Sequence, residues 1–461
     1  MTHCLRLGLV IGLLTAGACG PRVVVDSGAT GDASSATGVT GTSAALPPET
    51  DASATSVSGS SGAADSSTTG DPSIPPRFVS LGDDYTCVVT QESTVRCWGR
   101  TAGTEIGDDE PASEALALEL EGPVERLSTG LGANCAVLVG GSVTCWGSNH
   151  FGDLGYADTL RREAPPTGPV ELGAAAIDVS LSTPTCVLLE SQEVRCWGWG
   201  IHGVLGQGAG TCPCDCDCGP ECCIGDEELP TDWPVVSVGA PVAVVRASLA
   251  SVCVLTPDGR VRTWGSWSSI GHGNGAGPEF DIGDDELPSG APDVEVGGVA
   301  QAIACGAPSC ALLDDGTLRC WGGDHSGYGV GEPVGDDETP ASMGPIALPG
   351  RVVKIAAGFF EVCAVLEDAT LYCWGRNSRG ELGLGHLEPI GDDETPLQAG
   401  PVDVGGPVAS VSIGGDHACA ILTDGTLRCW GDNEYGQLGY GHTNDIGDDE
   451  TPASAGPVPW Q

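Results

Sequence analysis

The sequence predicts an all-β protein that folds as a closed β-propeller of seven blades, and three observations support this. A Trp-Gly pair recurs seven times, at Trp98, Trp146, Trp197, Trp264, Trp321, Trp374 and Trp430. Each pair ends a segment with the composition of a β-hairpin. The 385 residues from 77 to 461 divide into seven units of 55. A period near 50 residues with strand and turn content is typical of propellers.

The last hairpin shows the local pattern most clearly. An apolar alternating run reaches Leu422, the turn Thr423-Asp-Gly follows, and a second run ends in Cys-Trp-Gly. Asp-Gly is a hairpin turn because glycine adopts positive φ without steric cost. With Leu422 facing Thr426, Cys419 lies opposite Cys429. Cross-strand neighbours at this spacing are close enough for a disulfide.

Cysteine spacing repeats with the hairpins. Six of the seven hairpins carry two cysteines ten positions apart: Cys87 and Cys97, Cys135 and Cys145, Cys186 and Cys196, Cys310 and Cys320, Cys363 and Cys373, Cys419 and Cys429. We expect each pair to be a disulfide, which places the chain in an oxidising compartment. Each closes a small loop, so its stabilisation is about 2–3 kcal/mol or less.

The remaining cysteines have two interpretations each. Cys253 faces Thr263 instead of a cysteine, and Cys305 is an extra cysteine on the first strand of blade 5. These two could pair across blades 4 and 5, but we favour two buried free thiols. An insert at 211–223 holds Cys212, Cys214, Cys216, Cys218, Cys222 and Cys223. We favour a disulfide-knotted loop there over a thiolate cluster that binds Zn²⁺ or Cu⁺, and a loop that departs from the repeat is a candidate for a binding function.

A second repeated segment follows the hairpin, Gly-x-Asn-x-x-Gly-x-Leu-Gly-x-Gly. Its clearest copies occupy 375–385 and 431–441. Together with the preceding Cys-Ala-Leu-Leu-x-Asp-Gly-x-Leu pattern, it resembles the regulator of chromosome condensation repeat family over everything after about residue 77. The resemblance implies a seven-bladed propeller of four-stranded blades. Blade 1 lacks the Asn-x-x-Gly segment, blade 3 carries the insert, and blade 4 has lost the second cysteine and Leu-Gly.

The region before the repeats predicts export and tethering. Residues 1–19 have a positive start, a short apolar run and a small-residue site ending in Cys19, and so resemble a bacterial lipoprotein signal. We expect Cys19 to be lipidated; an ordinary signal peptide with an incidental cysteine is the alternative. Residues 20–76 are rich in Ser, Thr, Gly, Ala and Asp and bury too little apolar surface to fold. They are predicted to form a disordered linker.

Within each blade we expect the first, apolar strand to lie nearest the axis and the Cys hairpin to supply the next two strands. The Leu-Gly segment and a Pro-Val run then supply the outer strand and the crossing. The seven tryptophans of Trp-Gly are predicted to pack between blades, because one aromatic at one structural position in every repeat is core rather than a ligand cage. The terminal segment 457–460 is predicted to help close the ring against blade 1.

An acidic element recurs in six of the seven blades, and blade 2 has residues 157–163 in its place. Ile-Gly-Asp-Asp-Glu begins at Ile106, Ile282, Ile390 and Ile446, and close variants begin at Val334 and Ile224. Oxygen ligands of this kind suit Ca²⁺; the candidate ligands are Asp108, Asp109, Asp284, Asp285, Asp336, Asp337, Asp392, Asp393, Asp448 and Asp449. We favour a structural interpretation, in which the apolar residue anchors a solvated turn, because three consecutive acids are not expected to converge on one ion. No cofactor is therefore expected, with calcium as the alternative.

Composition and motifs limit the function. The net charge of −45, from 18 basic and 63 acidic residues, disfavours nucleic acid and anionic membrane surfaces. The histidines hold inconsistent repeat positions, and no nucleophile elbow, zinc-protease motif or phosphate loop is present. A glycan-active enzyme needs paired carboxylates in a pocket, whereas the repeated acids here fall in rim loops. The chain is therefore predicted not to be an enzyme.

The sequence thus predicts a monomeric, membrane-tethered binding or scaffold protein of a bacterial outer membrane or cell surface, with a secreted or periplasmic protein as the alternative location. Propeller loops would bind a protein or glycan partner. A structural surface protein without a specific ligand is the main alternative function, and an envelope glycan-active enzyme is a less favoured one. The guanine-nucleotide exchange of the family's namesake is not expected in an exported, acidic chain.

Overall fold

The computed structural model describes residues 75–100, 105, 106, 110–208, 223–273, 275, 277 and 280–461. They belong to one compact unit, Asp71–Gln461. The signal segment with Cys19, most of the linker and Cys212 to Cys222 of the insert lie outside the described residues. Among the residues described, no helix combines the length and apolar character needed to cross a membrane.

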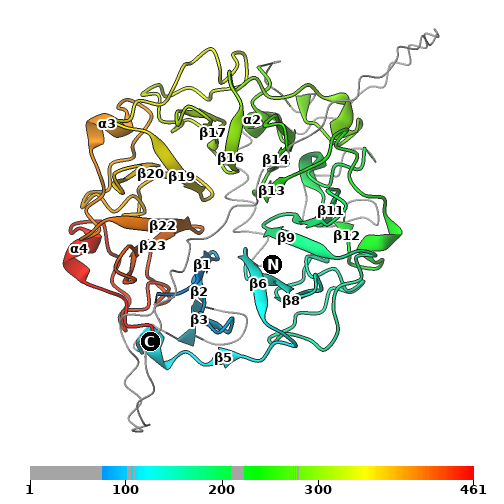
Figure 1. Ribbon diagram of the computed structural model, residues 1–461, viewed down its shortest axis with the longest axis horizontal. Coiled ribbons are helices and arrows are strands. Elements are labelled where there is room, and N and C mark those ends of the chain that lie inside the picture. The colour runs from blue at the N-terminus through cyan, green and yellow to red at the C-terminus, as the bar shows by residue number, and fades with distance from the viewer. Residues whose placement is uncertain are drawn as a thin grey trace, which may run out of the picture. The chain divides into compact units, whose positions relative to one another are not determined.

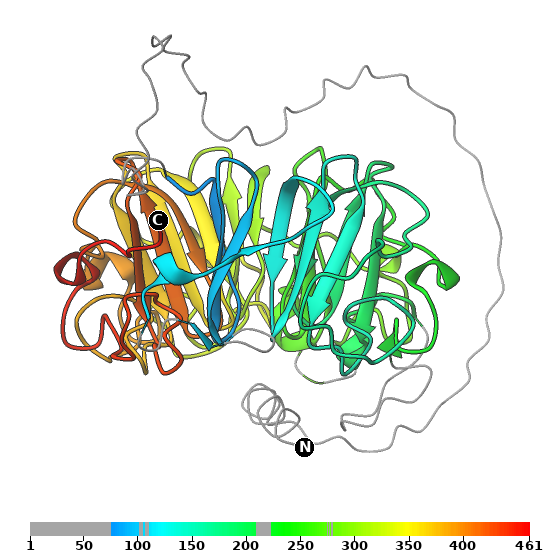
Figure 2. The same cartoon turned by 90° about the horizontal axis from the view of Figure 1, so that it is seen from below.

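The described residues form seven antiparallel sheets arranged as a ring (Figure 1). The first strand of each sheet lies nearest the axis of the ring, and the following strands lie progressively outward. Seen from the side, the strands run between the two faces of the ring (Figure 2). The predicted seven-bladed propeller is therefore confirmed.

Three strands recur in every blade. The first strands are β1 (Phe78–Leu81), β6 (Val124–Thr129), β9 (Ala176–Leu181), β13 (Val244–Ala247), β16 (Ala300–Ala304), β19 (Val352–Ala357) and β22 (Val408–Ile413). The second strands are β2 (Tyr85–Val89), β7 (Ala133–Leu138), β10 (Thr185–Leu189), β14 (Ser251–Leu255), β17 (Ser309–Leu313), β20 (Glu361–Leu366) and β23 (His417–Leu422). The third strands are β3 (Val95–Arg100), β8 (Val143–Gly147), β11 (Val194–Trp199), β15 (Val261–Gly265), β18 (Leu318–Trp321), β21 (Leu371–Gly375) and β24 (Leu427–Gly431).

The remaining elements are short. Blades 1 and 3 carry the additional strands β4 (Glu105–Ile106), β5 (Ala117–Leu118) and β12 (Cys223–Ile224). The helical turns are η1 (Ala112–Glu114), η2 (Ile201–Gly203), η3 (Pro230–Asp232), α2 (Trp267–Ile270), η5 (Pro288–Gly290), α3 (Pro396–Ala399) and α4 (Pro452–Ala455). Helices α3 and α4 lie at the outer perimeter of the ring (Figure 1).

The hairpin register matches the sequence prediction. In the last blade Cys419 lies opposite Cys429. The N–H of Leu422 donates to the oxygen of Thr426 at 2.9 Å, and Gly425 has a φ of 89°. Opposite residues in an antiparallel pair alternate between hydrogen-bonded and non-hydrogen-bonded positions, and the Cα atoms are closer at the latter. Three residues along from this hydrogen-bonded pair, the two cysteines occupy a non-hydrogen-bonded position. Their Cα atoms are 4.1 Å apart.

Each of the six predicted cysteine pairs is a disulfide in the structure, in blades 1, 2, 3, 5, 6 and 7. Our preference for free thiols at Cys253 and Cys305 was wrong. These residues form a disulfide with a Cα–Cα distance of 5.8 Å. Cys253 faces Thr263 within its own hairpin, so its sulfur bonds instead to the cysteine that follows β16 of the next blade.

We expect peptide mapping without reduction to recover one peptide that links Cys253 to Cys305. Removing this bond with two serine substitutions should cost about 1.5 kcal/mol more than removing Cys363–Cys373 in the same way, because it spans 52 residues instead of 10 and loop-closure entropy grows with the logarithm of length. Free thiols at these two positions, detected by alkylation of the denatured protein, would contradict the pairing.

The outer edge of most blades consists of two short contacts rather than a continuous fourth strand. The apolar residue of the acidic element bridges the glycine of Trp-Gly, as between Ile390 and Gly375 or Ile446 and Gly431. The valine of the Pro-Val run then donates its N–H to the start of the third strand, as Val402 does to Leu371 at 2.8 Å. The acidic residues therefore lie between two fixed points on the outer edge.

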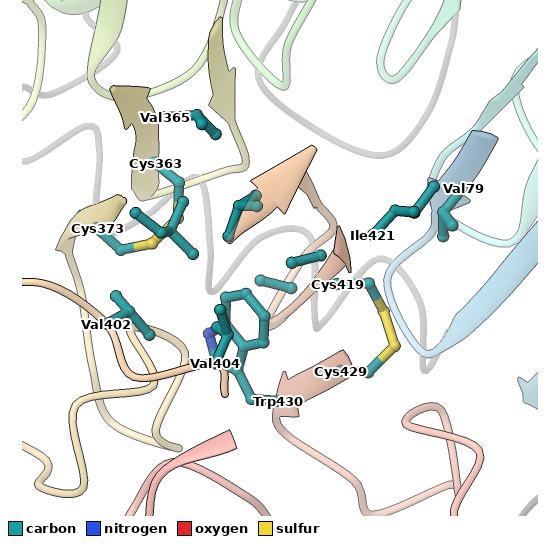
Figure 3. Close-up of a cluster of buried hydrophobic side chains, with 14 of the residues drawn as sticks. Val79, Cys363, Val365, Cys373, Val402, Val404, Cys419, Ile421, Cys429 and Trp430 are labelled. Carbon is teal, nitrogen blue, oxygen red and sulfur yellow. A yellow bond between two sulfur atoms is a disulfide. The ribbon is translucent and has the colours of Figure 1, made fainter. Parts of the chain in front are cut away.

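The tryptophans of Trp-Gly pack between blades, as predicted, and each is at most 3% exposed. Figure 3 shows Trp430 beside Val404 within the apolar cluster that also holds the disulfides of blades 6 and 7. Five indole N–H groups also donate a hydrogen bond to the preceding blade. The acceptor is a backbone carbonyl in the loop after the third strand, in the residue just before a buried Leu or Ile. These pairs are Trp98–Gln437, Trp197–Asp153, Trp264–Val204, Trp321–Ser269 and Trp430–Glu381, at 2.8–3.2 Å.

The ring closes through contacts between blades 1 and 7. The indole N–H of Trp98 reaches Gln437 at 3.0 Å, and the Thr86 hydroxyl lies 2.9 Å from Nε2 of His417. The terminal segment lies along its own blade, because Val458 donates to Leu427 at 2.9 Å. Trp460 is buried in the same apolar cluster as residues of blade 1.

Candidate functional site

The acidic elements share one face of the ring. In blades 1, 2, 4, 6 and 7 the second strand begins opposite the glycine of Trp-Gly, as Glu361 does opposite Gly375 and His417 opposite Gly431, and in blades 3 and 5 it begins opposite the tryptophan. Neighbouring strands are antiparallel, so the second strand begins at the end of the blade where the third strand finishes. This end therefore also holds the link between the first two strands, the Asn-x-x-Gly loop and the start of the acidic element. We call this end the loop face, and the opposite end, which holds the Asp-Gly hairpin turns, the turn face.

The first two residues of the acidic element have structural roles. Ile282, Ile390 and Ile446 are each at most 4% exposed. The following glycine has a φ of 97° to 113° in these three copies, a region that favours glycine. Its carbonyl accepts an N–H from the preceding blade, as Gly447 does from Gly385 at 3.0 Å. The element therefore joins each blade to the one before it.

The three acids that follow do converge, contrary to our expectation. One carboxylate oxygen from each lies within 4.8 Å of the others in four copies: 284–286, 336–338, 392–394 and 448–450. We call these four sets the acidic triads. The positive-φ glycine and a tight turn fold the chain back, so that the N–H of Asp285 donates to Oδ1 of Asp284 at 2.8 Å. Asp108 and Asp109 of blade 1 lie outside the described residues.

The triads alter the protonation of their glutamates. Burial, together with the two neighbouring aspartates, raises the pKa of Glu286, Glu394 and Glu450 to about 7. The pKa of Glu338 is raised for the same reasons. A proton shared within the triad relieves repulsion between carboxylates that lie this close. The net charge of these loops therefore changes near neutral pH.

A cavity of about 510 Å³ lies beside the last triad, at the junction of blades 6 and 7. It is lined by Arg379, Glu434, Thr443, Asn444, Asp445 and the triad 448–450. Arg379 comes from the Asn-x-x-Gly loop of blade 6, and its guanidinium lies 3.4 Å from Asp445 and 3.9 Å from Glu434. Carboxylates outnumber the single arginine in this lining, so the cavity is an acidic site.

A second group of carboxylates, which sequence analysis missed, lies at the same junction. Oxygens of Glu361, Glu381 and Asp416 lie within 4.8 Å of one another. Arg376 lies among them: its Nε is 3.8 Å from Oε1 of Glu361 and 3.7 Å from Oε1 of Glu381, and its Nη2 contacts Asp416. We call these four residues the junction cluster.

Glu361 is the most unusual member of the junction cluster. Its side chain is 1% exposed, and burial raises its pKa to about 8 although Arg376 acts in the opposite direction. The equivalent residue, two positions before the first hairpin cysteine, is Tyr85, Ala133, Pro184, Ser251, Pro308 and His417 in the other blades. The sequence does show that blade 6 alone has a carboxylate at this position. The neighbouring residues do not show that this carboxylate is buried beside Glu381.

The insert is described only at its end. Cys223 begins β12, is buried and is disulfide-bonded. Its bonded state agrees with the preference for a disulfide-containing loop. Cys212, Cys214, Cys216, Cys218 and Cys222 lie outside the described residues.

Comparison with known proteins identifies the repeats. A family model described as regulator of chromosome condensation (RCC1) repeat matches residues 352–381 and 408–437, and a second model of the same description matches residues 368–421. This chain contains regulator of chromosome condensation repeats. The matched segments contain β19 to β24, which form the last two blades and the junction between them.

Other relatives extend this likeness to the rest of the propeller. The ultraviolet-B receptor UVR8 of Arabidopsis thaliana is 26% identical over 342 residues, 72% of this chain and 71% of the receptor. The E3 ubiquitin-protein ligase HERC2 of Homo sapiens is 29% identical over 385 residues, 79% of this chain but 7% of the ligase. The match to HERC2 therefore concerns one small part of a much longer protein.

Solved structures support the regulator of chromosome condensation fold independently. Yeast RCC1 (Prp20), in its structure with Kap60, has a TM-score of 0.57 at 18% identity and covers 85% of this chain and 89% of its own. Human WBSCR16 has a TM-score of 0.56 at 18% identity and covers 74% of this chain and 85% of its own. At this identity the likeness concerns the fold alone.

Proposed function

We propose that this protein is a non-enzymatic binding protein displayed outside the cytoplasm, and that its loop face binds a positively charged segment of a partner protein. The observation that carries the proposal is the repetition of the acidic triads at one position of successive blades. Carboxylates on one face sum to a negative potential, which attracts cationic partners and excludes anionic ones. The acidic cavity beside residues 448–450 provides a concave part of this surface.

Export and tethering complete the proposal. The disulfides of the blades persist in an oxidising environment. The lipoprotein-type signal would leave Cys19 as a lipid anchor, and residues 20–76 would hold the propeller away from a bacterial outer membrane. We therefore place the binding surface at the envelope.

Two features favour binding over catalysis on a glycan. Glycoside hydrolysis needs two accessible carboxylates on either side of the scissile bond. Glu361 and Glu381 approach each other, but their side chains are each 1% exposed, so a sugar ring cannot reach between them. The triads, in turn, are each formed by consecutive residues of one loop, and the other two carboxylates of the cavity beside residues 448–450, Glu434 and Asp445, pair with Arg379.

The comparisons favour a protein partner. The solved structure of Prp20p from Saccharomyces cerevisiae is titled for its binding to Gsp1p and histones, at a TM-score of 0.54 and 19% identity. That binding belongs to the yeast protein. It supports, by analogy, a propeller of this family that acts through protein contacts.

The proposal predicts charge-dependent binding that is specific to the loop face. A fluorescent octalysine peptide should bind the protein at low salt, and Asp448→Asn combined with Asp449→Asn and Glu450→Gln should weaken it by about three- to tenfold, since exposed charge pairs of this kind contribute about 0.2–0.5 kcal/mol each. Fluorescence anisotropy measures the affinity.

The matched control removes three acids from the turn face, with Glu92→Gln, Glu190→Gln and Glu367→Gln. These three residues are exposed and follow second strands, so the control also replaces three carboxyl groups with amides. The control should bind the peptide within about twofold of the wild type because screening limits long-range effects. Equal weakening in both variants would reject the loop face as the binding surface, and binding of an uncharged glycan with no peptide binding would reject a protein partner.

A further inference from the structure

We propose that Glu361, Glu381 and Asp416 form a binding site for a divalent cation of the Ca²⁺ type, and that the guanidinium of Arg376 takes the place of this ion when none is bound. The site lies on the loop face between blades 6 and 7. It is distinct from the acidic triads, because its ligands come from two blades rather than from one loop.

The geometry brings three separate segments together. Glu361 begins β20, Glu381 lies in the loop after β21, and Asp416 lies between β22 and β23. One oxygen of each lies within 4.8 Å of the others. Three carboxylates supply up to six oxygen atoms, and Ca²⁺ takes six to eight oxygen ligands in flexible geometry.

The carboxylate of Glu361 is only partly satisfied by hydrogen bonds. Its Oε2 accepts the N–H of Phe360 at 3.2 Å. Its Oε1 is buried and has no hydrogen-bond partner in the described part of the chain. The nearest positive atom is Nε of Arg376 at 3.8 Å, and this Nε also lacks a hydrogen-bond partner among the described residues. A buried oxygen without a hydrogen-bond partner destabilises the folded state, and a bound cation would remove this cost.

The net charge of the junction cluster also favours a bound divalent cation. When its three carboxylates are ionised, the junction cluster has a net charge of −2 with Arg376 included, which a divalent ion would neutralise. Arg376 is 34% exposed, and its guanidinium lies 4.8 Å from the centroid of the Phe360 ring. It can therefore leave the glutamates toward solvent while the buried carboxylates keep their positions.

The test is thermal unfolding of the full-length protein, purified with its disulfides intact and stripped with EDTA, with and without millimolar CaCl₂. Ca²⁺ should raise the unfolding midpoint by several degrees, because a ligand that binds only the native state stabilises it. Glu361→Gln should abolish this shift. Arg376→Gln should tighten Ca²⁺ binding by about tenfold or more in calorimetric titration, because it removes the competing cation.

The triad variant Asp448→Asn with Glu450→Gln separates this site from the loops. It should keep the Ca²⁺ shift of the wild type. A shift that is lost in the triad variant and kept in Glu361→Gln would overturn the proposal, as would the absence of Ca²⁺ binding in both the wild type and Arg376→Gln. If Glu361→Gln does not fold, the gain in affinity of Arg376→Gln decides the question.

Discussion

Replacing Trp430 with alanine is expected to lower the free energy of unfolding by about 3–5 kcal/mol, the range for large aromatic residues in well-packed cores. Trp430 is 0% exposed and lies in the apolar cluster of blades 6 and 7 (Figure 3). Its indole N–H also donates to Glu381 at 2.9 Å. The substitution therefore opens a cavity and removes a hydrogen bond between blades. Urea unfolding followed by circular dichroism measures the loss.

The equivalent tryptophan of blade 6 provides a control for the hydrogen bond. Trp374 is also 0% exposed, but its Nε1 has no hydrogen-bond partner within the described part of the chain. Trp430→Phe should therefore destabilise the protein by about 1–3 kcal/mol more than Trp374→Phe, because only the first leaves a buried carbonyl unpaired. Equal losses in the two phenylalanine variants would show that the indole hydrogen bond contributes nothing.

The stability of the wild type, measured in EDTA, is expected to fall as the pH rises from about 5 to about 9. Burial raises the pKa of Glu361 from 4.5 to about 8, so the folded state binds more protons than the unfolded state between these values. Stability therefore decreases with pH across this window. One pKa unit corresponds to about 1.4 kcal/mol, so the contribution of Glu361 amounts to several kcal/mol. Urea midpoints at each pH measure it.

Glu361→Gln isolates this contribution. Glutamine stays neutral, so the stability of the variant relative to the wild type should increase steadily from pH 6 to pH 9. The exposed Glu367, on the turn face of the same blade, serves as the control, and Glu367→Gln should leave the pH profile unchanged. A parallel decline of wild type and Glu361→Gln would show that Glu361 does not titrate in this range.

Contacts within one hairpin were predictable from the sequence. The ten-residue spacing of Cys419 and Cys429 and the Asp-Gly turn between them determine which residues face each other, and the structure has that register. The same holds for the blade count, because Trp-Gly occurs once in each sheet. These features depend on a few neighbouring residues and on the fixed geometry of a turn.

Contacts between blades were not predictable in the same way. The disulfide between Cys253 and Cys305 joins two sheets. The sequence of neither repeat indicates how these two sheets pack against each other. The convergence of residues 448–450 depends on the backbone angles after Gly447, whose φ is 103°, rather than on the residue types alone. Sequence reasoning therefore chose the wrong alternative for Cys253, and it did not anticipate how closely the carboxylates of residues 448–450 approach one another.

The repeat pattern by itself determined the number of blades, the hairpin register and the disulfide of each Cys-Cys hairpin, because these follow from local turn chemistry and alternation along a strand. The packing of one blade against the next determined the partner of Cys253 and the approach of Asp416 to Glu361 and Glu381. The physical reason is that Cys305 lies 52 positions from Cys253, and Asp416 lies 55 and 35 positions from the two glutamates, so only the docking of one sheet against another brings these side chains together.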